Sequence, residues 1–300
     1  MTHNFLAIVN PAAGGGKCGS LAGAALERVR ALGIELDVRE TTRAGQATDL
    51  AREAYRKGTR AFLAVGGDGT TYEIINGLFP DALRDGRAML GFLPLGTGNS
   101  FLRDFTSSGV ENTIAALREG RRRACDVIRL QHAEGEIYFL NLLSLGFPAE
   151  VGETANQHFK GWGEPGYILA VFRHVIHLDH QAFPHRLDGA GEWNRDRNLF
   201  LTFSNSKFTG GKMMIAPDAD PTDGLIEYVR WGPIGRAGLL WTLPRLFTGT
   251  HTKHPLAARA GVQRVEFALD ASVNVMVDGE SLRLQCQSLE ILPGALDVIV

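Results

Sequence analysis

The most constraining feature of the sequence is a glycine-rich loop directly after a short apolar run. Ala61–Val65 forms the run, and Gly66-Gly67-Asp68-Gly69-Thr70-Thr71 follows it. A continuous apolar run of this length is typical of a strand buried on both faces of a parallel sheet. Glycines at this point allow positive φ angles and let a ligand approach bare backbone. A helix beginning there would direct free N–H groups at an anion, so the loop predicts a phosphate-binding site.

Asp68 is the unexpected member of this loop, because a carboxylate inside a phosphate-binding loop repels its ligand. Its presence becomes sensible if Mg²⁺ lies between the carboxylate and the phosphate, or if Asp68 handles a proton from an attacking hydroxyl. The alternative is a tight turn in which Asp68 caps the next helix. Glycine on both sides of the acid favours the ligand-binding interpretation.

Two further glycine-rich segments follow apolar runs in the same way. Gly96-Thr97-Gly98-Asn99-Ser100 comes after Met89–Leu93, and its Thr97 and Asn99 offer polar side chains to a nucleotide. Asn10-Pro11-Ala12-Ala13-Gly14-Gly15-Gly16-Lys17 comes after Phe5–Asn10. It is not a Walker A loop, because Pro11 stands at the first glycine position and Cys18 replaces Ser or Thr. Lys17 either reaches a phosphate or is an exposed loop lysine.

The first part of the chain alternates strand-like and helix-like segments. The predicted strands are Phe5–Asn10, Ile34–Glu40, Ala61–Val65 and Met89–Leu93, and the predicted helices include Thr48–Lys57 and Val110–Glu119. Another helix is expected from about Ser20 to Leu32, with Leu21, Ala25, Val29 and Leu32 at helical spacing. This alternation predicts an α/β fold with a doubly wound parallel sheet, whose ligands bind beyond the carboxyl ends of the strands. We assign residues 1–127 to this nucleotide-binding domain.

Residues 128–300 have the pattern of short strands separated by turns, which favours a C-terminal antiparallel β-sandwich. The expected strands are Val127–Leu130, Glu136–Leu145, Asn198–Ser204, Leu225–Trp231, Arg264–Leu269, Val273–Val277 and Ser288–Leu292, with one helix at Tyr167–Leu178. We expect the last residues, about 288–300, to return to the first domain.

The three glycine loops, in this order, resemble the catalytic domain of the diacylglycerol kinase-like lipid kinases, which include sphingosine and ceramide kinases. The resemblance extends to Thr41–Ala47 and to five later segments, Ser204–Ser206, Gly210-Gly211, Ala216–Ala219, Asp223–Leu225 and Val277–Glu280. The GGDGT loop alone is shared with NAD kinases and phosphofructokinases, so the later motifs make the resemblance specific. It implies that ATP is bound by Asn10, Thr41, Gly66, Gly67, Asp68, Gly69, Thr70, Thr71, Tyr72, Gly96, Thr97 and Asn99.

The resemblance also implies roles for acidic residues. Asp223, with backbone carbonyls near Asp220 and Leu225, would hold a structural Mg²⁺. Glu280 would accept the proton of the lipid hydroxyl, working with Asp68 at the metal and phosphate, and Asp126 would belong to the same acidic network. Many relatives have Asp where this chain has Ser100, and Asp104 lies one helical turn further on.

Each assignment has a structural alternative. Asp278-Gly279-Glu280 follows an alternating strand, so glycine either lets the turn direct Glu280 toward a cleft between the domains or forms an ordinary hairpin with two solvated acids. Asp218, Asp220 and Asp223 form either a metal site or a solvated loop. The apolar stretch from Arg236 to Phe247, which contains Trp241, contacts either a membrane interface or the core of the second domain.

Composition limits the class of function. The net charge of −2 provides no basic field for nucleic acid, and the three widely spaced cysteines argue for a reducing compartment. No stretch is long enough to span a membrane. These features favour a cytoplasmic protein. The resemblance implies in addition an enzyme that is peripheral and transient at the membrane, with ATP and Mg²⁺ as its cofactors. The acceptor is expected to be diacylglycerol, with a sphingoid base or ceramide as the alternative. NAD kinase and a non-catalytic regulator are more distant alternatives, and a homodimer is compatible with the sequence.

Overall fold

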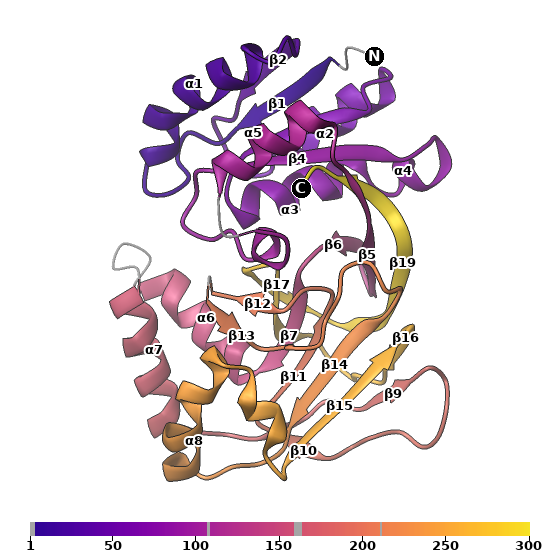
Figure 1. Ribbon diagram of the computed structural model, residues 1–300. Helices are drawn as coiled ribbons and strands as arrows, with labels where there is room; N and C mark the ends of the chain where they lie inside the picture. The colour runs from indigo at the N-terminus through magenta and orange to yellow at the C-terminus, as the bar shows by residue number, and fades with distance from the viewer. Residues whose placement is uncertain (1–3, 107–108, 159–163, 211) are drawn as a thin grey trace. The chain divides into compact units, whose positions relative to one another are not determined.

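The computed structural model describes residues 4–106, 109–158, 164–210 and 212–300, and the chain divides into two compact units (Figure 1). One unit comprises Met1–Val127 and Leu292–Val300, and the other comprises Ile128–Ile291. Two long strands belong partly to each unit, β5 (Arg123–His132) and β19 (Cys286–Val298).

The first unit contains a parallel sheet with the strand order β2-β1-β3-β4-β19. These strands are β1 (Phe5–Val9), β2 (Leu36–Glu40), β3 (Ala61–Gly66) and β4 (Ala88–Pro94), with β19 paired to β4 through Leu296–Val298. Every residue of β1 and β3 is buried, as expected for strands covered on both faces.

Helices lie on both faces of this sheet. Residues of α1 (Lys17–Arg30) and α5 (Val110–Glu119) share one buried cluster with alternate residues of β1 and β3. On the other face α2 (Gln46–Arg56) packs against α3 (Asp68–Leu78). Short helices complete the unit, α4 (Asp81–Arg84) and the 3-10 helix η1 (Phe101–Asp104). The predicted doubly wound parallel sheet is therefore confirmed.

The first helix differs from its prediction. It begins at Lys17, and its buried stripe consists of Cys18, Ala22, Ala25, Leu26 and Val29, whereas Leu21 is 51% exposed. Of the residues at helical spacing, Ala25 and Val29 lie in this stripe and Leu21 lies outside it. Alanine and cysteine make up most of the stripe, so α1 packs closely on the sheet.

The second unit contains a six-stranded antiparallel sheet in the order β15-β14-β11-β7-β17-β18. Its strands are β7 (Leu142–Gly146), β11 (Phe200–Ser204), β14 (Ile226–Trp231), β15 (Ala257–Val262), β17 (Val273–Val277) and β18 (Glu280–Leu284). The expectation of one continuous strand over Glu136–Leu145 is wrong, because the chain leaves β6 (Gly135–Phe139) at Leu140 and starts β7 at Leu142.

A second layer of strands covers one face of the six-stranded sheet. Phe203 of β11 contacts Phe267 of β16 (Arg264–Phe267) edge to face, and His185 of β9 (His185–Leu187) shares a 2.9 Å hydrogen bond with the Tyr228 hydroxyl of β14. These contacts between the layers, with antiparallel pairing in both, confirm the predicted antiparallel β-rich second domain. Two short hairpins, β8 (Gln181–Ala182) with β10 (Arg197–Asn198) and β12 (Phe208–Thr209) with β13 (Met213–Met214), lie outside these sheets.

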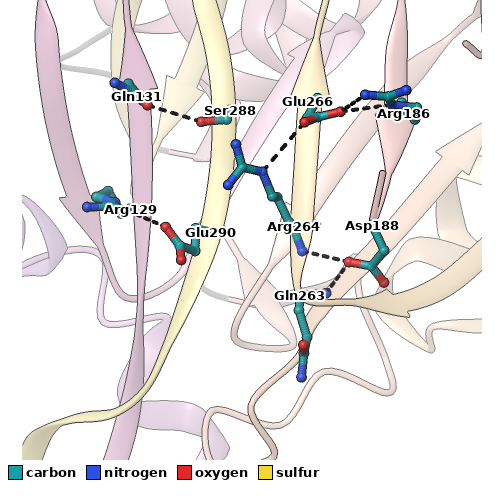
Figure 2. A network of polar contacts seen from close by, with 9 residues as sticks. All are labelled: Arg129, Gln131, Arg186, Asp188, Gln263, Arg264, Glu266, Ser288 and Glu290. Carbon is teal, nitrogen blue, oxygen red and sulfur yellow. Dashed lines mark hydrogen bonds and ion pairs between the residues drawn. The ribbon is translucent and has the colours of Figure 1, made fainter. Parts of the chain in front are cut away.

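Polar side chains join neighbouring strands of this second layer (Figure 2). Arg129 of β5 pairs with Glu290 of β19, and Arg186 of β9 donates its Nε to Glu266 of β16 at 2.8 Å. At the end of β9, one Asp188 carboxylate oxygen accepts two backbone N–H groups, from Gln263 and Arg264, both at 2.8 Å. The outer layer is thus held by cross-strand polar pairs as well as by its backbone pairing.

Helices cover the other face of the six-stranded sheet. They are α6 (Phe147–His158), α7 (Glu164–Ile176), α8 (Arg236–Thr242) and two 3-10 helices, η2 (Leu243–Phe247) and η3 (Thr250–Lys253). Leu239 of α8 and Leu246 of η2 join a buried cluster with Phe200 and Trp231 of the sheet. No helix within the described ranges has the length and apolarity needed to cross a bilayer.

Gly77 offers a test of the packing in the first unit. A Cβ on Gly77 of α3 would lie 2.4 Å from the Thr48 carbonyl oxygen of α2, whereas a Cβ on Gly23 of α1 would meet nothing within 4 Å. We expect Gly77→Ala to lower the free energy of unfolding by about 1–3 kcal/mol, because the two helices must separate. Gly23→Ala is the control and should raise it by roughly 0.5–1 kcal/mol, because alanine is the better helix former. Urea unfolding followed by circular dichroism measures both, and equal effects of the two substitutions would contradict this packing.

Candidate active site

Two glycine loops of the first unit contact each other through bare backbone. The Gly96 N–H donates to the Gly66 carbonyl oxygen at 2.8 Å, and the Asp68 N–H donates to the Gly98 carbonyl oxygen at 3.0 Å. A Cβ on Gly96 would lie 2.5 Å from the Cα of Gly67, which is closer than real Cβ contacts allow. None of these glycines has a positive φ. Of the two reasons that the sequence suggested for glycine here, positive φ is therefore wrong, and ligand approach to bare backbone stays a prediction. Close approach between the loops is a further reason that the structure supplies.

The third glycine loop adjoins this pair. Gly14 has a φ of 63°, and a Cβ there would lie 2.9 Å from the Leu95 carbonyl oxygen. The Asn10 N–H donates to the Val65 carbonyl oxygen at 2.9 Å, and the Asn10 side-chain oxygen accepts from the Ala12 N–H at 3.2 Å. Lys17, the first residue of α1, is exposed. All three predicted loops therefore meet at the carboxyl ends of β1, β3 and β4.

The carboxylate of Asp68 connects the two contacting loops. Its oxygens accept the Ser100 N–H at 3.0 and 2.9 Å, and the Ser100 hydroxyl and the Phe101 N–H also bond to it. Burial raises the pKa of Asp68, and these hydrogen bonds act in the opposite direction. The alternative in which Asp68 caps its own helix is wrong, because its carboxylate binds amides at the start of η1 rather than those of α3.

Ser100 is buried at 2% exposure. Its hydroxyl and its N–H both donate to Asp68, so this one residue supplies two donors to the carboxylate. Asp104 lies at the end of η1 and is partly buried.

The glycine loops leave amide groups open. Among the described residues, no partner accepts a hydrogen bond from the backbone N–H of Gly67, Gly69 or Gly98. Gly67 and Gly69 lie at the N-terminus of α3, where the helix dipole favours an anion. Open glycine amides of this kind, on two loops in contact, can donate to phosphate oxygens.

The threonines of the first loop point inward. The Thr70 hydroxyl packs against Gly66: a Cβ added to Gly66 would lie 2.3 Å from the hydroxyl oxygen. The Thr71 hydroxyl donates to the Gly67 carbonyl oxygen at 3.5 Å. Thr97 is exposed, Tyr72 is partly buried, and the Asn99 side-chain N–H donates to the Gly96 carbonyl oxygen at 3.1 Å. The loop therefore offers backbone rather than threonine hydroxyls to a ligand.

Glu73, which no sequence motif indicated, holds the segment Thr41–Ala47 next to the first loop. Its carboxylate on α3 accepts the backbone N–H of Gly45 at 2.9 Å and of Ala47 at 3.0 Å, at the start of α2. The Thr41 N–H donates to the Val9 carbonyl oxygen at 2.8 Å, which extends β2 past its end. Glu73 lies within α3 and its partners lie at the start of α2, nearly 30 residues earlier in the chain, so no local sequence pattern indicates the contact.

In the second unit, Asp278 is the anchor of the turn that precedes Glu280. Asp278 and Gly279 have φ angles of 48° and 91°, as in a two-residue type I′ hairpin between β17 and β18. The Asp278 carboxylate accepts three backbone N–H groups, from Leu140 at 3.0 Å, Asn141 at 2.9 Å and Leu142 at 3.0 Å. The alternative of two solvated acids is therefore wrong for Asp278, which is buried, whereas Glu280 is exposed.

The acidic loop before β14 carries the predicted metal ligands. One Asp220 oxygen accepts the Thr222 N–H at 3.0 Å, and one Asp223 oxygen accepts the Leu225 N–H at 2.9 Å. Partial burial and the charge of Asp220 raise the pKa of Asp223. Within the described residues no group of three or more acidic, histidine or cysteine side chains could hold a metal, so a cation here would also need backbone oxygens. Carboxylate and carbonyl oxygens are the ligands that Mg²⁺ prefers.

Asp126 lies elsewhere in the first unit. It is buried at 2% exposure, and its carboxylate accepts the Gly294 N–H at 2.7 Å. Asp126 thus ties β5 to β19, and its membership of an acidic network stays a prediction.

A parallel sheet with open glycine amides at its carboxyl edge, joined to an antiparallel β-rich unit, defines a two-unit nucleotide-binding fold. A crystal structure from Bacillus anthracis has the same fold, with a TM-score of 0.79, 21% identity and coverage of 99% of this chain and 95% of that one. A second from that organism, described as a diacylglycerol kinase, has a TM-score of 0.72 at 19% identity and covers 99% and 96% of the two chains.

Sequence comparison identifies the family. Residues 4–130 match the diacylglycerol kinase catalytic domain, and residues 141–300 match the YegS C-terminal NAD kinase beta sandwich-like domain. The "Diacylglycerol kinase" of Mycobacterium tuberculosis is 30% identical over 98% of this chain and 94% of its own. A Pseudomonas fluorescens protein named "Probable lipid kinase YegS-like" is 32% identical over 92% of this chain and 89% of its own. The chain belongs to this diacylglycerol kinase and YegS-like family and is a lipid kinase, which makes ATP its phosphoryl donor.

Gly96→Ala tests the contact between the loops. Because its Cβ would overlap the backbone of Gly67, the loops must separate, and we expect ATP affinity to fall at least about tenfold, equivalent to about 1.4 kcal/mol. Isothermal titration with a non-hydrolysable ATP analogue measures this affinity. Gly23→Ala, whose Cβ meets open space in the same unit, is the matched control and should bind like the unmodified chain.

Asp278→Asn tests the anchored turn. Asparagine removes the charge from all three contacts and leaves at least one of the three buried amides without an acceptor, so we expect the free energy of unfolding to fall by about 2–4 kcal/mol. Asp270→Asn, at an exposed acid in the preceding loop, should change it by less than about 0.5 kcal/mol. Urea unfolding compares the two, and an Asp278 variant as stable as the control would rule out the anchor.

Proposed function

We propose that the chain transfers the γ-phosphoryl group of ATP to the hydroxyl of diacylglycerol, producing phosphatidic acid. The observation that carries the proposal is the pair of contacting glycine loops, whose open amides at Gly67, Gly69 and Gly98 suit the phosphates of ATP. The choice of diacylglycerol is supported by the name of the Mycobacterium tuberculosis relative. A sphingoid base or ceramide carries a similar primary hydroxyl and is the competing acceptor.

The first unit is proposed to bind ATP. The amides of Gly67 and Gly69 donate to phosphate oxygens at the N-terminus of α3, and Gly98 donates from the second loop. Asn10, Thr41, Tyr72, Thr97 and Asn99 border the same carboxyl edge and would contact the rest of the nucleotide. The N–H groups of Thr70 and Thr71 both donate to the Gly67 carbonyl oxygen, at 3.0 and 3.2 Å, so these two residues would border the phosphates while the glycine amides bind them.

The second unit is proposed to supply the base. The lipid hydroxyl oxygen bonds to the γ-phosphorus, the bond to the bridging oxygen breaks, and ADP leaves. Glu280 accepts the hydroxyl proton, which an alcohol loses late in such transfers, so the carboxylate need only reach it. The anchored hairpin at Asp278 fixes the position of Glu280 at the first residue of β18.

Mg²⁺ is proposed at two places. Asp220, Asp223 and the backbone oxygen of Leu225 would hold a structural ion in the loop before β14, where repulsion between the two acids is relieved by a cation. Asp68, near the phosphates, would hold the ion that accompanies ATP. The bound ion supplies positive charge to the phosphate oxygens.

A panel of acceptors tests the proposal. The purified chain, labelled ATP and Mg²⁺ are mixed with diacylglycerol, sphingosine, ceramide or NAD in detergent micelles, and labelled products are separated by chromatography. We expect labelled phosphatidic acid and its loss when EDTA removes the metal. Labelling of sphingosine or ceramide alone would replace diacylglycerol as the acceptor, and labelling of NAD alone would refute lipid phosphorylation.

Glu280→Gln tests the proposed base. The amide cannot accept the proton, so we expect kcat to fall by about 10²–10⁴-fold while the KM for ATP changes little. Glu134→Gln is the matched control, because Glu134 is an exposed acid in the turn between β5 and β6. Steady-state kinetics compares them, and a Glu280 variant with unchanged kcat would remove this residue from the mechanism.

A further inference from the structure

Exposed apolar side chains are concentrated on one part of the second unit. Among the described residues, eight large apolar side chains are exposed, and six of them lie between Leu169 and Leu256. They lie on α7, α8 and η2 and in the loop after η3: Leu169, Ile176, Leu240, Trp241, Phe247 and Leu256. The other two, Leu21 and Leu83, are isolated on helices of the first unit.

The α8–η2 segment has one side packed on the protein core and one apolar side exposed. Leu239, Thr242 and Leu246 face the core of the second unit, while Leu240, Trp241 and Phe247 are 43%, 78% and 57% exposed. Arg236 donates its Nε to the carbonyl oxygens of Val175 and Ile176, which joins the start of α8 to the end of α7. The segment is therefore held from beneath, with an apolar surface left outside. The sequence-based choice between core and membrane contact was too simple, since the segment has a core side and an exposed side.

The chain segment that carries α8, η2 and η3 has charged residues of one sign. No Asp or Glu occurs between Glu227 and Glu266, whereas six Lys and Arg residues do. Three of the six, Arg230, Arg259 and Arg264, form ion pairs with acids of the second unit. Arg245 and Lys253 are exposed, and neither forms an ion pair with any residue the structure describes. Two unneutralised cations thus accompany the exposed Trp241 and Phe247.

We propose that Leu240, Trp241, Arg245, Phe247 and Lys253, the α8 surface, dock the second unit on a bilayer that contains anionic lipid. The inference rests on the proposed lipid acceptor, because a lipid of that kind resides in a bilayer. Tryptophan with aliphatic neighbours is favoured at the water–lipid interface, and free arginine and lysine attract anionic headgroups. A bilayer satisfies both features of the α8 surface at once.

Vesicle co-sedimentation tests the apolar part of the α8 surface. We expect Trp241→Glu and Phe247→Glu each to lower the partition onto phosphatidylcholine–phosphatidylglycerol vesicles by about tenfold or more. Leu21→Glu and Leu83→Glu are matched controls, since they place the same charge at exposed leucines of the first unit. They should leave the partition unchanged. Equal loss in all four variants, or no loss at Trp241 and Phe247, would overturn the proposal.

The cationic part has its own comparison. We expect Arg245→Gln and Lys253→Gln together to lower the partition by about fivefold for each charge when phosphatidylglycerol is present, and to have no effect on pure phosphatidylcholine vesicles. Arg122→Gln and Arg123→Gln together, at exposed arginines of the first unit, are the matched control. A larger effect of the control pair would place the docking surface on the first unit.

Activity separates this surface from the kinase site. With a dispersed short-chain diacylglycerol the Trp241 and Phe247 variants should retain full kcat, and with long-chain diacylglycerol in vesicles they should lose activity in proportion to binding. Loss of short-chain activity in a variant with unchanged thermal unfolding would assign these residues to the kinase site instead.

Size-exclusion chromatography with light scattering identifies a contact between copies: a dimer that Trp241→Glu converts to a monomer, with vesicle binding unchanged, would overturn the proposal. Vesicle binding without phosphorylation of any lipid would refute the proposed function and leave the α8 surface standing.

Discussion

The contact between the Gly66-Gly67 and Gly96–Gly98 segments is the constraint on which the candidate site depends. Two strand ends in a parallel sheet are about 5 Å apart, and side chains normally keep the loops that follow them from touching. Here Gly96 donates to Gly66 at 2.8 Å, and no Cβ fits between the two loops. This close approach brings the Ser100 amide to Asp68 and leaves the amides of Gly67, Gly69 and Gly98 directed away from protein partners. A single carboxylate and several open amides are thereby positioned by backbone alone, which gives the site little freedom to rearrange.

The sequence predicted the first unit well because its signals are local. Buried apolar runs followed by glycines mark β1, β3 and β4, and parallel-sheet topology then brings their loops to one edge. One of the two reasons offered for the glycines, φ freedom, was wrong, since φ freedom is a property of one segment and close approach depends on two. Spacing in α1 identified Ala25 and Val29, which are buried, but it could not show that Cys18, Ala22 and Leu26 rather than Leu21 complete the buried stripe.

The second unit was less predictable because its decisive contacts join distant positions. The Asp278 carboxylate accepts the N–H groups of Leu140, Asn141 and Leu142, more than 130 residues earlier in the chain. This contact lies at the break between β6 and β7, where the local pattern predicted one continuous strand. The same contact turns an exposed-looking hairpin acid into a buried anchor. Glu73 in the first unit is a similar case, because neither periodicity nor residue spacing could predict its hydrogen bonds to Gly45 and Ala47. For the α8–η2 segment the sequence left membrane contact and core packing open, and the packing of Leu239 and Leu246 is what separates its buried side from its exposed side.

The last strand has a consequence for how the chain reaches its native state. β19 supplies Leu296–Val298 as the neighbour of β4 in the first unit, although some 160 residues of the second unit lie between β4 and this segment in the chain. During synthesis β1 to β4 leave the ribosome long before β19, the fifth strand of their sheet. Until then the edge of β4 is unpaired, and an open edge of this kind invites association with other chains. Vectorial synthesis therefore leaves the nucleotide-binding sheet incomplete while the second unit is being made.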